Sequence, residues 1–287
     1  MKTSKKKVMF MESNKVEKNL VSVIMGVYNC EKTIVDAVES ILNQTYSEIQ
    51  FIICDDCSTD NTYKILEEYK NKYDDRIVLL RNDSNHMLAY SLNRCLEKAT
   101  GYYIARMDGD DISTVDRIKK QVDYLKNNKE IDLCGTAMQR FDDNGFGSVD
   151  KAVSHPNKDT MLKGKIPFNH ATICTYKKVY DELNGYVVSK YTRRAEDRNL
   201  WYRFFNLGFK GENIEEPLYL VRENIDALKR RTIKDRWYGY MNNLNGYRLL
   251  KASWRDYLVL SIMTLIKMIV PVRLVYFYRN IEKNIQK

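Results

Sequence analysis

The segment Leu20–Val27, LVSVIMGV, decides the fold class of this 287-residue chain. It is a short apolar run rich in β-branched residues, which is typical of a strand buried on both faces. The turn Tyr28-Asn29-Cys30 follows. The next residues predict an amphipathic helix whose apolar face holds Ile34, Val38, Ile41 and Leu42. A buried strand that leads through a short turn into a helix is typical of the first unit of an α/β domain.

The alternation of strand and helix continues downstream. Further strands are predicted over Gln50–Cys54, Ile77–Leu80 and Tyr102–Ala105, with helices at residues 63–69, 88–99 and 114–126. The pattern predicts an α/β fold with a mostly parallel central sheet flanked by helices. Ligands of such sheets bind beyond the carboxyl ends of the strands, so polar residues that follow a strand are the first candidates for a site.

The second half of the chain gives weaker signals. Residues 131–137 form another apolar run. Residues 141–165 are more polar and are expected to form a loop or an irregular insertion, whereas residues 168–174, FNHATIC, are expected to form a strand. A helix is predicted to begin near Glu196 and to end at Gly208.

The composition, with 44% hydrophobic and 30% charged residues, is that of a globular protein. The six cysteines show neither the spacing of a disulfide framework nor that of a zinc site, so reduced thiols in a cytoplasmic protein are expected. Near the N-terminus only Val8–Met11 is apolar, which is too short for the core of a signal peptide. Residues 1–19 are therefore expected to be a flexible basic leader.

Positive charge is concentrated in residues 228–287, which hold 13 Lys or Arg against 3 Asp or Glu. Residues 234–287 are expected to form a helical extension that is both basic and apolar. Its apolar run Tyr257–Val270 contains Lys267 and is shorter than the roughly 20 residues of a membrane-spanning helix. Two interpretations stay open: a helix packed on the domain or on a partner chain, and an interfacial helix on an anionic membrane. Nucleic acid is not an expected partner, because the segment is apolar as well as basic.

Three carboxylates follow the fourth predicted strand in the segment YIARMDGDD: Asp108, Asp110 and Asp111. Like charges about 5 Å apart repel by roughly 3 kcal/mol per pair at an effective dielectric near 20. A divalent cation that prefers oxygen ligands, Mg²⁺ or Mn²⁺, would turn this repulsion into attraction, and Mg²⁺ commonly shares its ligands with a diphosphate. The alternative is a solvated acidic turn in which Asp111 or Ser113 caps the next helix.

Two further acidic pairs are candidates for a site. Asp55 and Asp56 follow the second predicted strand, where they could accept hydrogen bonds from a nucleobase or a ribose, or serve only a turn. Glu196 and Asp197 open a predicted helix. One of them could act as a general base on an attacking hydroxyl, or both could simply stabilise the helix N-terminus. The two strand-end clusters share one edge of the sheet, so they could converge on one site.

Five segments of the chain together resemble glycosyltransferase family 2. They are VSVIMGVYN, SILNQTY, DDCSTDNT, YSLNRCLEKATGYYIARMDGDDIS and AEDRNLWYRF. The resemblance covers residues 20–225 in the family's order and spacing. It implies the GT-A fold, that of nucleotide-diphospho-sugar transferases, for residues 20–233. It also implies an inverting, metal-assisted transfer of a sugar from a nucleotide-diphosphate donor, with a UDP-sugar as the first expectation.

The resemblance assigns roles on the donor side. The residues implied to bind the nucleotide-sugar are Tyr28, Asn29, Asp55 or Asp56, Arg81 and Asp108. Asp108 and Asp110 would form the metal–diphosphate motif for Mn²⁺ or Mg²⁺, with Asp110 as the more direct ligand.

On the acceptor side, the resemblance implies that Asp197 is the general base, with Glu196 as the alternative. His170 matches the family's acceptor-side histidine, although a purely structural histidine is an equally open interpretation. The basic run Lys229-Arg230-Arg231 would lie where a mobile segment could close over the diphosphate. The chain departs from the family pattern at Cys57 and Met87, where glycine is common.

The resemblance also implies a setting. The acceptor would be a glycan or a lipid-linked glycan, used in the assembly of capsule, exopolysaccharide or O-antigen at the inner face of the cell membrane. Two other functions stay open: a nucleotidyltransferase acting on a sugar phosphate, and a non-enzymatic module that binds through its basic tail. No glycine-rich, basic phosphate loop follows the first strand, which argues against the nucleotidyltransferase. The sequence does not fix the sugar, the acceptor or the oligomeric state.

Overall fold

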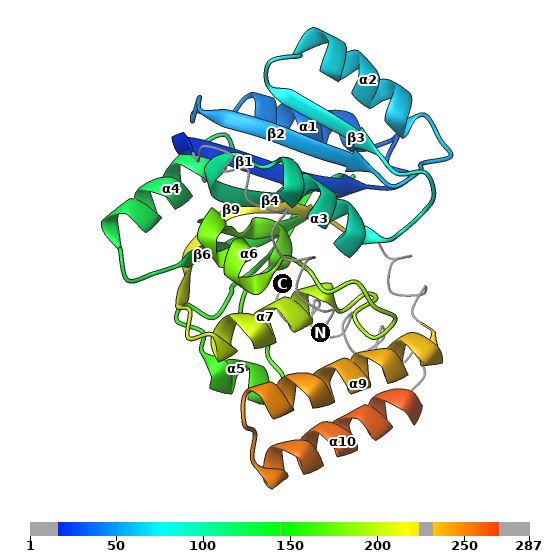
Figure 1. Cartoon of the computed structure of the whole chain (residues 1–287), viewed down its shortest axis with the longest axis vertical. Coiled ribbons are helices and arrows are strands. Elements are labelled where there is room, and N and C mark those ends of the chain that lie inside the picture. Colours follow the sequence, from blue (N-terminus) through cyan, green and yellow to red (C-terminus); the bar gives the residue numbers. More distant parts are fainter. Residues whose placement is uncertain (1–16, 144, 224–231, 270–287) are drawn as a thin grey trace, which may run out of the picture.

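The computed structural model describes residues 17–143, 145–223 and 232–269 (Figure 1). The strands are β1 (Glu17–Val27), β2 (Ile49–Asp55), β3 (Ile77–Arg81), β4 (Gly101–Asp108), β5 (Ile112–Ser113), β6 (Leu133–Asp142), β7 (Gly145–Asp150), β8 (Cys174–Tyr176) and β9 (Gly211–Arg222). The α-helices are α1 (Ile34–Leu42), α2 (Thr62–Lys72), α3 (Leu88–Lys98), α4 (Arg117–Asn127), α5 (Lys158–Leu162), α6 (Lys177–Leu183), α7 (Glu196–Asn206), α9 (Ile233–Leu249) and α10 (Trp254–Ile269).

The described strands form one sheet in the order β3-β2-β1-β4-β8-β6-β9-β5, with β7 paired to β6. The first four strands of this order are parallel, as predicted from the alternation of apolar runs and helices. The remaining strands add antiparallel pairs, including β8 against β4 and β5 against β9. The predicted α/β fold with helices on both faces of the sheet is confirmed (Figure 1).

The register of the parallel strands aligns their carboxyl ends. Asp55 at the end of β2 pairs with Val27 of β1 and with Arg81 of β3. Asp108 at the end of β4 pairs with Gly26 of β1. The two strand-end acidic clusters predicted from the sequence therefore lie on either side of the end of β1, on one rim of the sheet.

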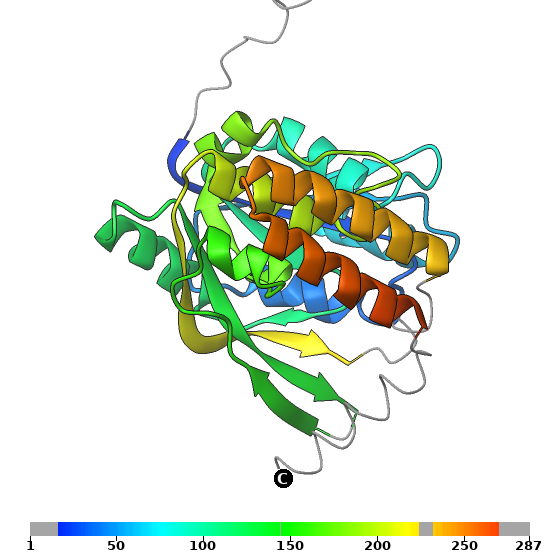
Figure 2. The ribbon, with the colours of Figure 1, turned by 90° about the horizontal axis from the view of Figure 1, so that it is seen from below.

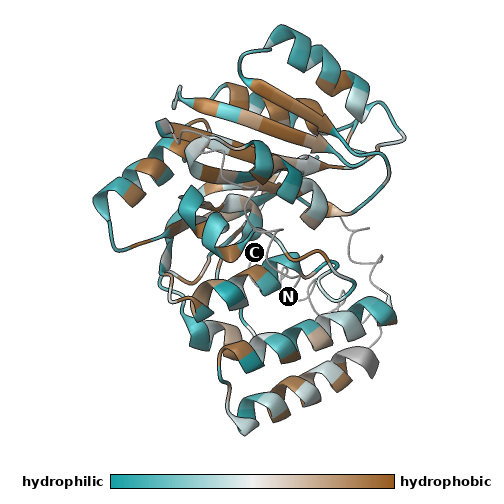
Figure 3. Cartoon of the chain, viewed as in Figure 1, coloured by the Kyte–Doolittle hydropathy of each residue, from teal (hydrophilic) through white to brown (hydrophobic). Residues whose placement is uncertain are grey.

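Side-chain alternation along β1 supplies both cores. Val21, Val23 and Met25 belong to a core closed by α1, α2 and α4, whereas Ile24 points to the opposite core, closed by α3, α6 and α7. These strand residues are fully buried. The apolar strands lie inside and the polar helix faces lie outside (Figure 3), so burial on both faces fixes the strand register from which the rim is built.

Two expectations about the middle of the chain are wrong. Residues 141–165 are not one irregular segment, because β6 and β7 form a hairpin closed at Gly145 (φ +117°) and α5 follows. Polar residues suit this hairpin because β7 is exposed along nearly its whole length. The expected strand at 168–174 is instead a 3₁₀ turn, His170–Thr172, that leads into β8.

The C-terminal helices form an antiparallel pair at the end of the molecule opposite α2 (Figures 1 and 2). Helix α9 packs on α7, and α10 packs on α9. Within the described ranges, no helix combines the length and the hydropathy needed to cross a bilayer. Residues 17–19 of the predicted leader already belong to β1. The rest of that leader, the Lys229-Arg230-Arg231 run and residues 270–287 lie outside the described residues.

The contact between α9 and α7 can be tested at Gly246. A Cβ atom at this position would lie 2.1 Å from the Tyr202 ring, so Gly246→Ala is expected to lower the free energy of unfolding by about 1–3 kcal/mol. Gly239 lies on the same helix, and a Cβ atom there would meet no other atom within 4 Å, so Gly239→Ala is expected to raise stability by up to about 1 kcal/mol. Chemical denaturation measures both values, and equal effects would contradict this packing.

Candidate active site

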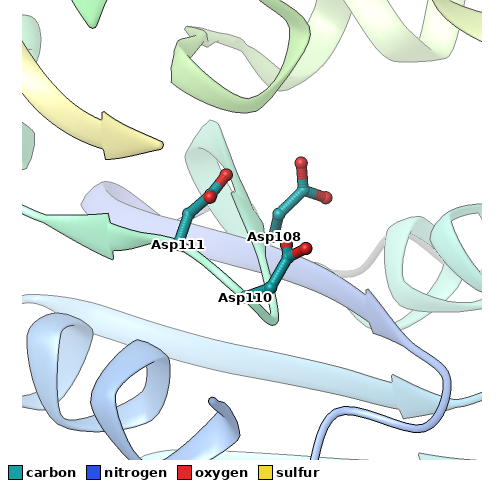
Figure 4. Close-up of side chains that lie close together, drawn as sticks. All are labelled: Asp108, Asp110 and Asp111. Carbon is teal, nitrogen blue, oxygen red and sulfur yellow. The ribbon is translucent and has the colours of Figure 1, made fainter. Parts of the chain in front are cut away.

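Three carboxylates lie close together where β4 ends and the loop to β5 begins (Figure 4): Asp108 is the last residue of β4, and Asp110 and Asp111 are in the loop. One ligand oxygen of each lies within 4.8 Å of the others. Burial and the Asp108 charge raise the pKa of Asp110 to about 6. Burial, with the charges of the other two carboxylates, raises the pKa of Asp111 well above its usual range. The donors are hard oxygens at one point of excess negative charge, which fits Mg²⁺ or Mn²⁺.

Asp111 does not cap the next helix, and neither does Ser113. Helix α4 begins only at Arg117, and its cap residue is Asp116. The Asp111 carboxylate instead accepts a hydrogen bond of 2.8 Å from the backbone N–H of Arg222, at the end of β9. The capping expectation was wrong because a strand more than 100 residues further along the chain supplies the partner, and no local pattern reveals it.

Arg106 was not among the predicted site residues. It lies two positions before Asp108 on β4, so both side chains point to the same face of the strand. Its guanidinium binds the Asp108 carboxylate in a bidentate ion pair, with Nη1–Oδ2 and Nη2–Oδ1 distances of 2.8 and 2.5 Å. The two-residue spacing of Arg106 and Asp108 within a predicted strand was the available sequence signal for this pair.

Asp55 and Asp56 serve different purposes. The Asp56 carboxylate accepts hydrogen bonds from Asn82 Nδ2 (2.6 Å) and from the backbone N–H groups of His86 (2.9 Å) and Met87 (2.8 Å). The Asp56 carboxylate therefore holds the loop after β3 in place. Asp55 accepts from the backbone N–H of Ser58, while its Oδ1 has no partner among the described residues.

The predicted donor-side residues Tyr28, Asn29 and Arg81 stand at the ends of β1 and β3, the two strands next to β2. Arg81 lies 3.6 Å from the Asp55 carboxylate and covers the Tyr63 ring. Tyr28 is 45% exposed at the end of β1. Asn29 fixes the neighbouring loop, because its side-chain oxygen accepts from the backbone N–H of Thr59 at 2.9 Å. The structure thus places these side chains around one rim, and their contacts with a nucleotide stay a prediction.

The two departures from the family pattern fall at backbone positions that favour glycine. Cys57 has φ +61° and Met87 has φ +72°. Met87 also has ψ +165°, a region that is essentially reserved for glycine. The hydrogen bond from the Met87 N–H to Asp56 helps to hold this strained backbone. The Met87 side chain is 42% exposed beside the rim, whereas a glycine would place no side chain there.

Glu196 and Asp197 begin α7. Burial, together with the Asp197 charge, raises the pKa of Glu196 to about 7, and the charges of Arg106 and Asp108 also reach it. The ionisation of Glu196 is therefore coupled to the charges of Asp108 and Arg106. Asp197 accepts a hydrogen bond of 2.7 Å from the backbone N–H of Arg198, which fixes one of its oxygens at the start of the helix.

His170 is a partly buried residue of the 3₁₀ turn before β8. Its Nε2 lies 2.7 Å from the Tyr186 hydroxyl, and its ring packs against Tyr186 and Trp201. Burial and the Arg106 charge lower its pKa well below the usual value, so the imidazole is neutral at pH 7. A structural role accounts for these contacts, and a role toward an acceptor stays a prediction.

Comparison with known proteins decides the family. Residues 22–183 match the profile of glycosyl transferase family 2. EpsE of Bacillus subtilis (strain 168), which is named a glycosyltransferase, is 46% identical over 244 residues, covering 84% of this chain and 86% of EpsE. The chain belongs to glycosyltransferase family 2. The family membership makes this protein a glycosyltransferase, and it leaves no support for the nucleotidyltransferase or for the non-enzymatic module.

Other relatives of this glycosyltransferase have more specific names. WfaP of Escherichia coli is 42% identical over 196 residues, covering 68% of this chain and 73% of WfaP. Its name is UDP-Glc:alpha-D-GlcNAc-diphosphoundecaprenol beta-1,3-glucosyltransferase.

A solved structure supports the GT-A fold of this glycosyltransferase. TarS (residues 1–349) of S. aureus, crystallised with UDP-GlcNAc, aligns with a TM-score of 0.64 at 18% identity. The match covers 78% of this chain and 65% of that one.

The raised pKa of Asp110 predicts that any binding of a cation at the acidic cluster depends on pH. Ionisation of crowded carboxylates opposes folding, so the metal-free protein should lose stability as the pH rises from about 4 to about 6. Protons compete with a cation for the same oxygens, so the affinity for Mn²⁺ should fall about tenfold per pH unit below pH 6. Electron paramagnetic resonance of free Mn²⁺ between pH 5 and pH 8 measures this.

Two variants test whether the pH dependence comes from the acidic cluster, one in the cluster and one as a control. Asp110→Asn should abolish the pH-dependent binding, whereas Asp74→Asn, at a carboxylate 82% exposed in an ion pair with Lys70, should leave it unchanged. An affinity that is independent of pH in the unmodified protein would contradict a cation site at these carboxylates.

Proposed function

We propose that this glycosyltransferase moves a sugar from a UDP-sugar to a hydroxyl of a glycan or lipid-linked acceptor, with inversion at the anomeric carbon. The reaction belongs to the assembly of a cell-surface polysaccharide. The observation that carries the proposal is that Asp55 with Arg81 and the acidic cluster lie on one rim of the sheet, at the carboxyl ends of its parallel strands.

The donor nucleotide would lie over the ends of β1, β2 and β3. Asp55 is the better candidate for the base and ribose, because the oxygens of Asp56 are occupied by the loop after β3. An unpaired carboxylate oxygen suits the N–H of a uracil ring. Tyr28 supplies an exposed ring at the same rim, and Arg81 supplies a cation beside Asp55.

The diphosphate would lie toward the acidic cluster. Asp110, with Asp108 proposed from the family motif, would hold Mn²⁺ or Mg²⁺ there, and a bound cation supplies positive charge where the leaving UDP develops negative charge. PcManGT of Pyrobaculum calidifontis, which aligns over 88% of this chain and 82% of its own at 14% identity and a TM-score of 0.56, was solved with GDP-Man and Mn²⁺.

Asp197 is the proposed general base. Its carboxylate would accept the proton of the acceptor hydroxyl while that oxygen bonds to the anomeric carbon from the face opposite to UDP. The bond between the anomeric carbon and the diphosphate oxygen breaks in the same step, which inverts the configuration. Glu196 is the alternative base, and its pKa, which burial and the Asp197 charge raise to about 7, supports that alternative.

A lipid-linked acceptor suits the C-terminal helices. Helix α10 exposes an apolar face made by Leu258, Val259, Ile262, Met263, Leu265 and Ile266. Basic residues at the start of α10 and before it, Lys251 and Arg255, are also exposed. An apolar face with neighbouring cations suits the interface of an anionic membrane, where the acceptor of WfaP would also reside. The enzyme would then act as a peripheral protein at the inner face of the cell membrane.

The base assignment is tested with matched amide variants. Asp197→Asn is expected to lower the release of UDP from the donor by about 10²–10⁴-fold, because proton transfer contributes that much. UDP binding, measured by calorimetry with Mn²⁺, should change little. A panel of UDP- and dTDP-sugars, each with Mn²⁺ and Mg²⁺, identifies the donor without knowledge of the acceptor.

Glu196→Gln is the comparison. If Asp197→Asn turns over normally while Glu196→Gln does not, the base is Glu196. If neither variant slows the release of UDP, the start of α7 does not supply the base.

The membrane contact is tested by sedimentation with vesicles. Wild-type protein is expected to sediment with phosphatidylglycerol vesicles and only weakly with phosphatidylcholine vesicles. Val259→Glu with Met263→Glu should reduce this binding about tenfold or more, since buried charge opposes insertion. Val115→Glu is the control, because Val115 is as exposed as Val259 but lies before α4. Equal losses in both variants, or no sedimentation of the wild type, would contradict the proposal.

A further inference from the structure

We infer that Arg106 is a positioning residue that keeps Asp108 out of the ligand set of the cation, so that the cation rests on Asp110 and Asp111. The inference rests on the proposed function of the acidic cluster as a cation site. It changes the role of Asp108 from metal ligand to one half of a fixed ion pair beside the metal.

The ion pair is rigid on the arginine side. Arg106 is 2% exposed, and both of its guanidinium Nη atoms bind the Asp108 carboxylate. Its backbone is held at both ends, because its N–H donates to Ile173 O and its carbonyl accepts from Arg117 Nη1, each at 3.0 Å. A bidentate arginine–carboxylate pair is among the more strongly directional ion pairs in proteins.

Among the described residues, Asp108 is the only carboxylate that is hydrogen-bonded to Arg106. The Arg106 Nε makes no hydrogen bond to any described residue, and its neighbours include the cation of Arg117 and the neutral ring of His170. The charge of Arg106 acts on the pKa of Glu196, but no hydrogen bond joins the two side chains in the described structure. Drawing the Asp108 carboxylate away toward a cation would break both hydrogen bonds that join it to a buried guanidinium, which is strongly unfavourable.

Asp110 and Asp111 differ from Asp108 in this respect. Within the described ranges, neither forms an ion pair with a basic side chain, although the backbone N–H of Arg222 binds Asp111. Each therefore keeps carboxylate oxygens that no basic side chain occupies, whereas both oxygens of Asp108 are bound by Arg106. The Arg222 guanidinium lies nearby, but its Nε donates to the Asp110 backbone carbonyl, at 3.2 Å, and not to the carboxylate.

A double-mutant cycle on Mn²⁺ affinity tests the inference, with electron paramagnetic resonance of free Mn²⁺ as the readout and no turnover needed. Asp108→Asn alone should weaken Mn²⁺ binding by about tenfold or more, because it leaves the charge of Arg106 beside the cation. The double variant Arg106→Gln/Asp108→Asn also lacks the arginine charge, and its Mn²⁺ affinity should return to within about threefold of wild type. Arg106→Lys with Asp108→Asn keeps the charge and should stay weak.

The outcomes separate the two proposals. If the Arg106→Gln/Asp108→Asn protein binds Mn²⁺ as weakly as Asp108→Asn, then Asp108 is a ligand and the inference on Arg106 is overturned. If Asp110→Asn binds Mn²⁺ as tightly as wild type, the cation site itself is wrong. Circular dichroism checks folding, and Arg106→Met with Asp108→Asn replaces the double variant if the glutamine protein does not fold.

Discussion

The mutual repulsion of carboxylates gathered at the ends of parallel strands is the constraint on which the site depends. Asp55 and Asp108 end strands on either side of β1 in one register, Asp56 follows the first of them, and Asp110 and Asp111 come within three residues of the second. The structure offsets this repulsion with partners brought from elsewhere. Arg106 neutralises Asp108, backbone N–H groups bind Asp55, Asp56 and Asp111, and burial raises the pKa of Asp110 toward neutrality.

The sequence predicted those strands and helices that a short run of neighbouring apolar residues is enough to identify. Strand β1 is apolar on both faces, and the strands beside it share its signal, so the parallel half of the sheet and its acidic rim could be predicted. The rest depends on contacts between distant segments. The partner of Asp111 is Arg222 on β9, and the partners of Asp56 lie beyond β3. The β6–β7 hairpin was missed because an exposed ribbon lacks the apolar alternation that marks a half-buried strand.

Both positions at which the chain departs from the family pattern lie in loops at the rim and have positive φ angles. Asn29, Cys57 and Met87 all adopt them, and each belongs to a loop that follows a strand of the rim or precedes α3. Glycine adopts such backbone angles without steric cost. Here side chains stand at these positions, and hydrogen bonds with Ser58, Thr59 and Asp56 hold the loops in place. The edge of the site thereby gains side chains that glycine would not supply.

The division of the chain around β4 has an evolutionary consequence. The residues proposed for the donor come from the first 111 positions, whereas Glu196 and Asp197 stand on α7, which packs in the opposite core with α6 and α9. The buried face of α7 shares its core with Ile52 and Cys54 of β2, the strand that ends at Asp55. Members of one lineage could therefore diversify the glycan they extend through residues outside that buried face, while inheriting an unchanged donor half.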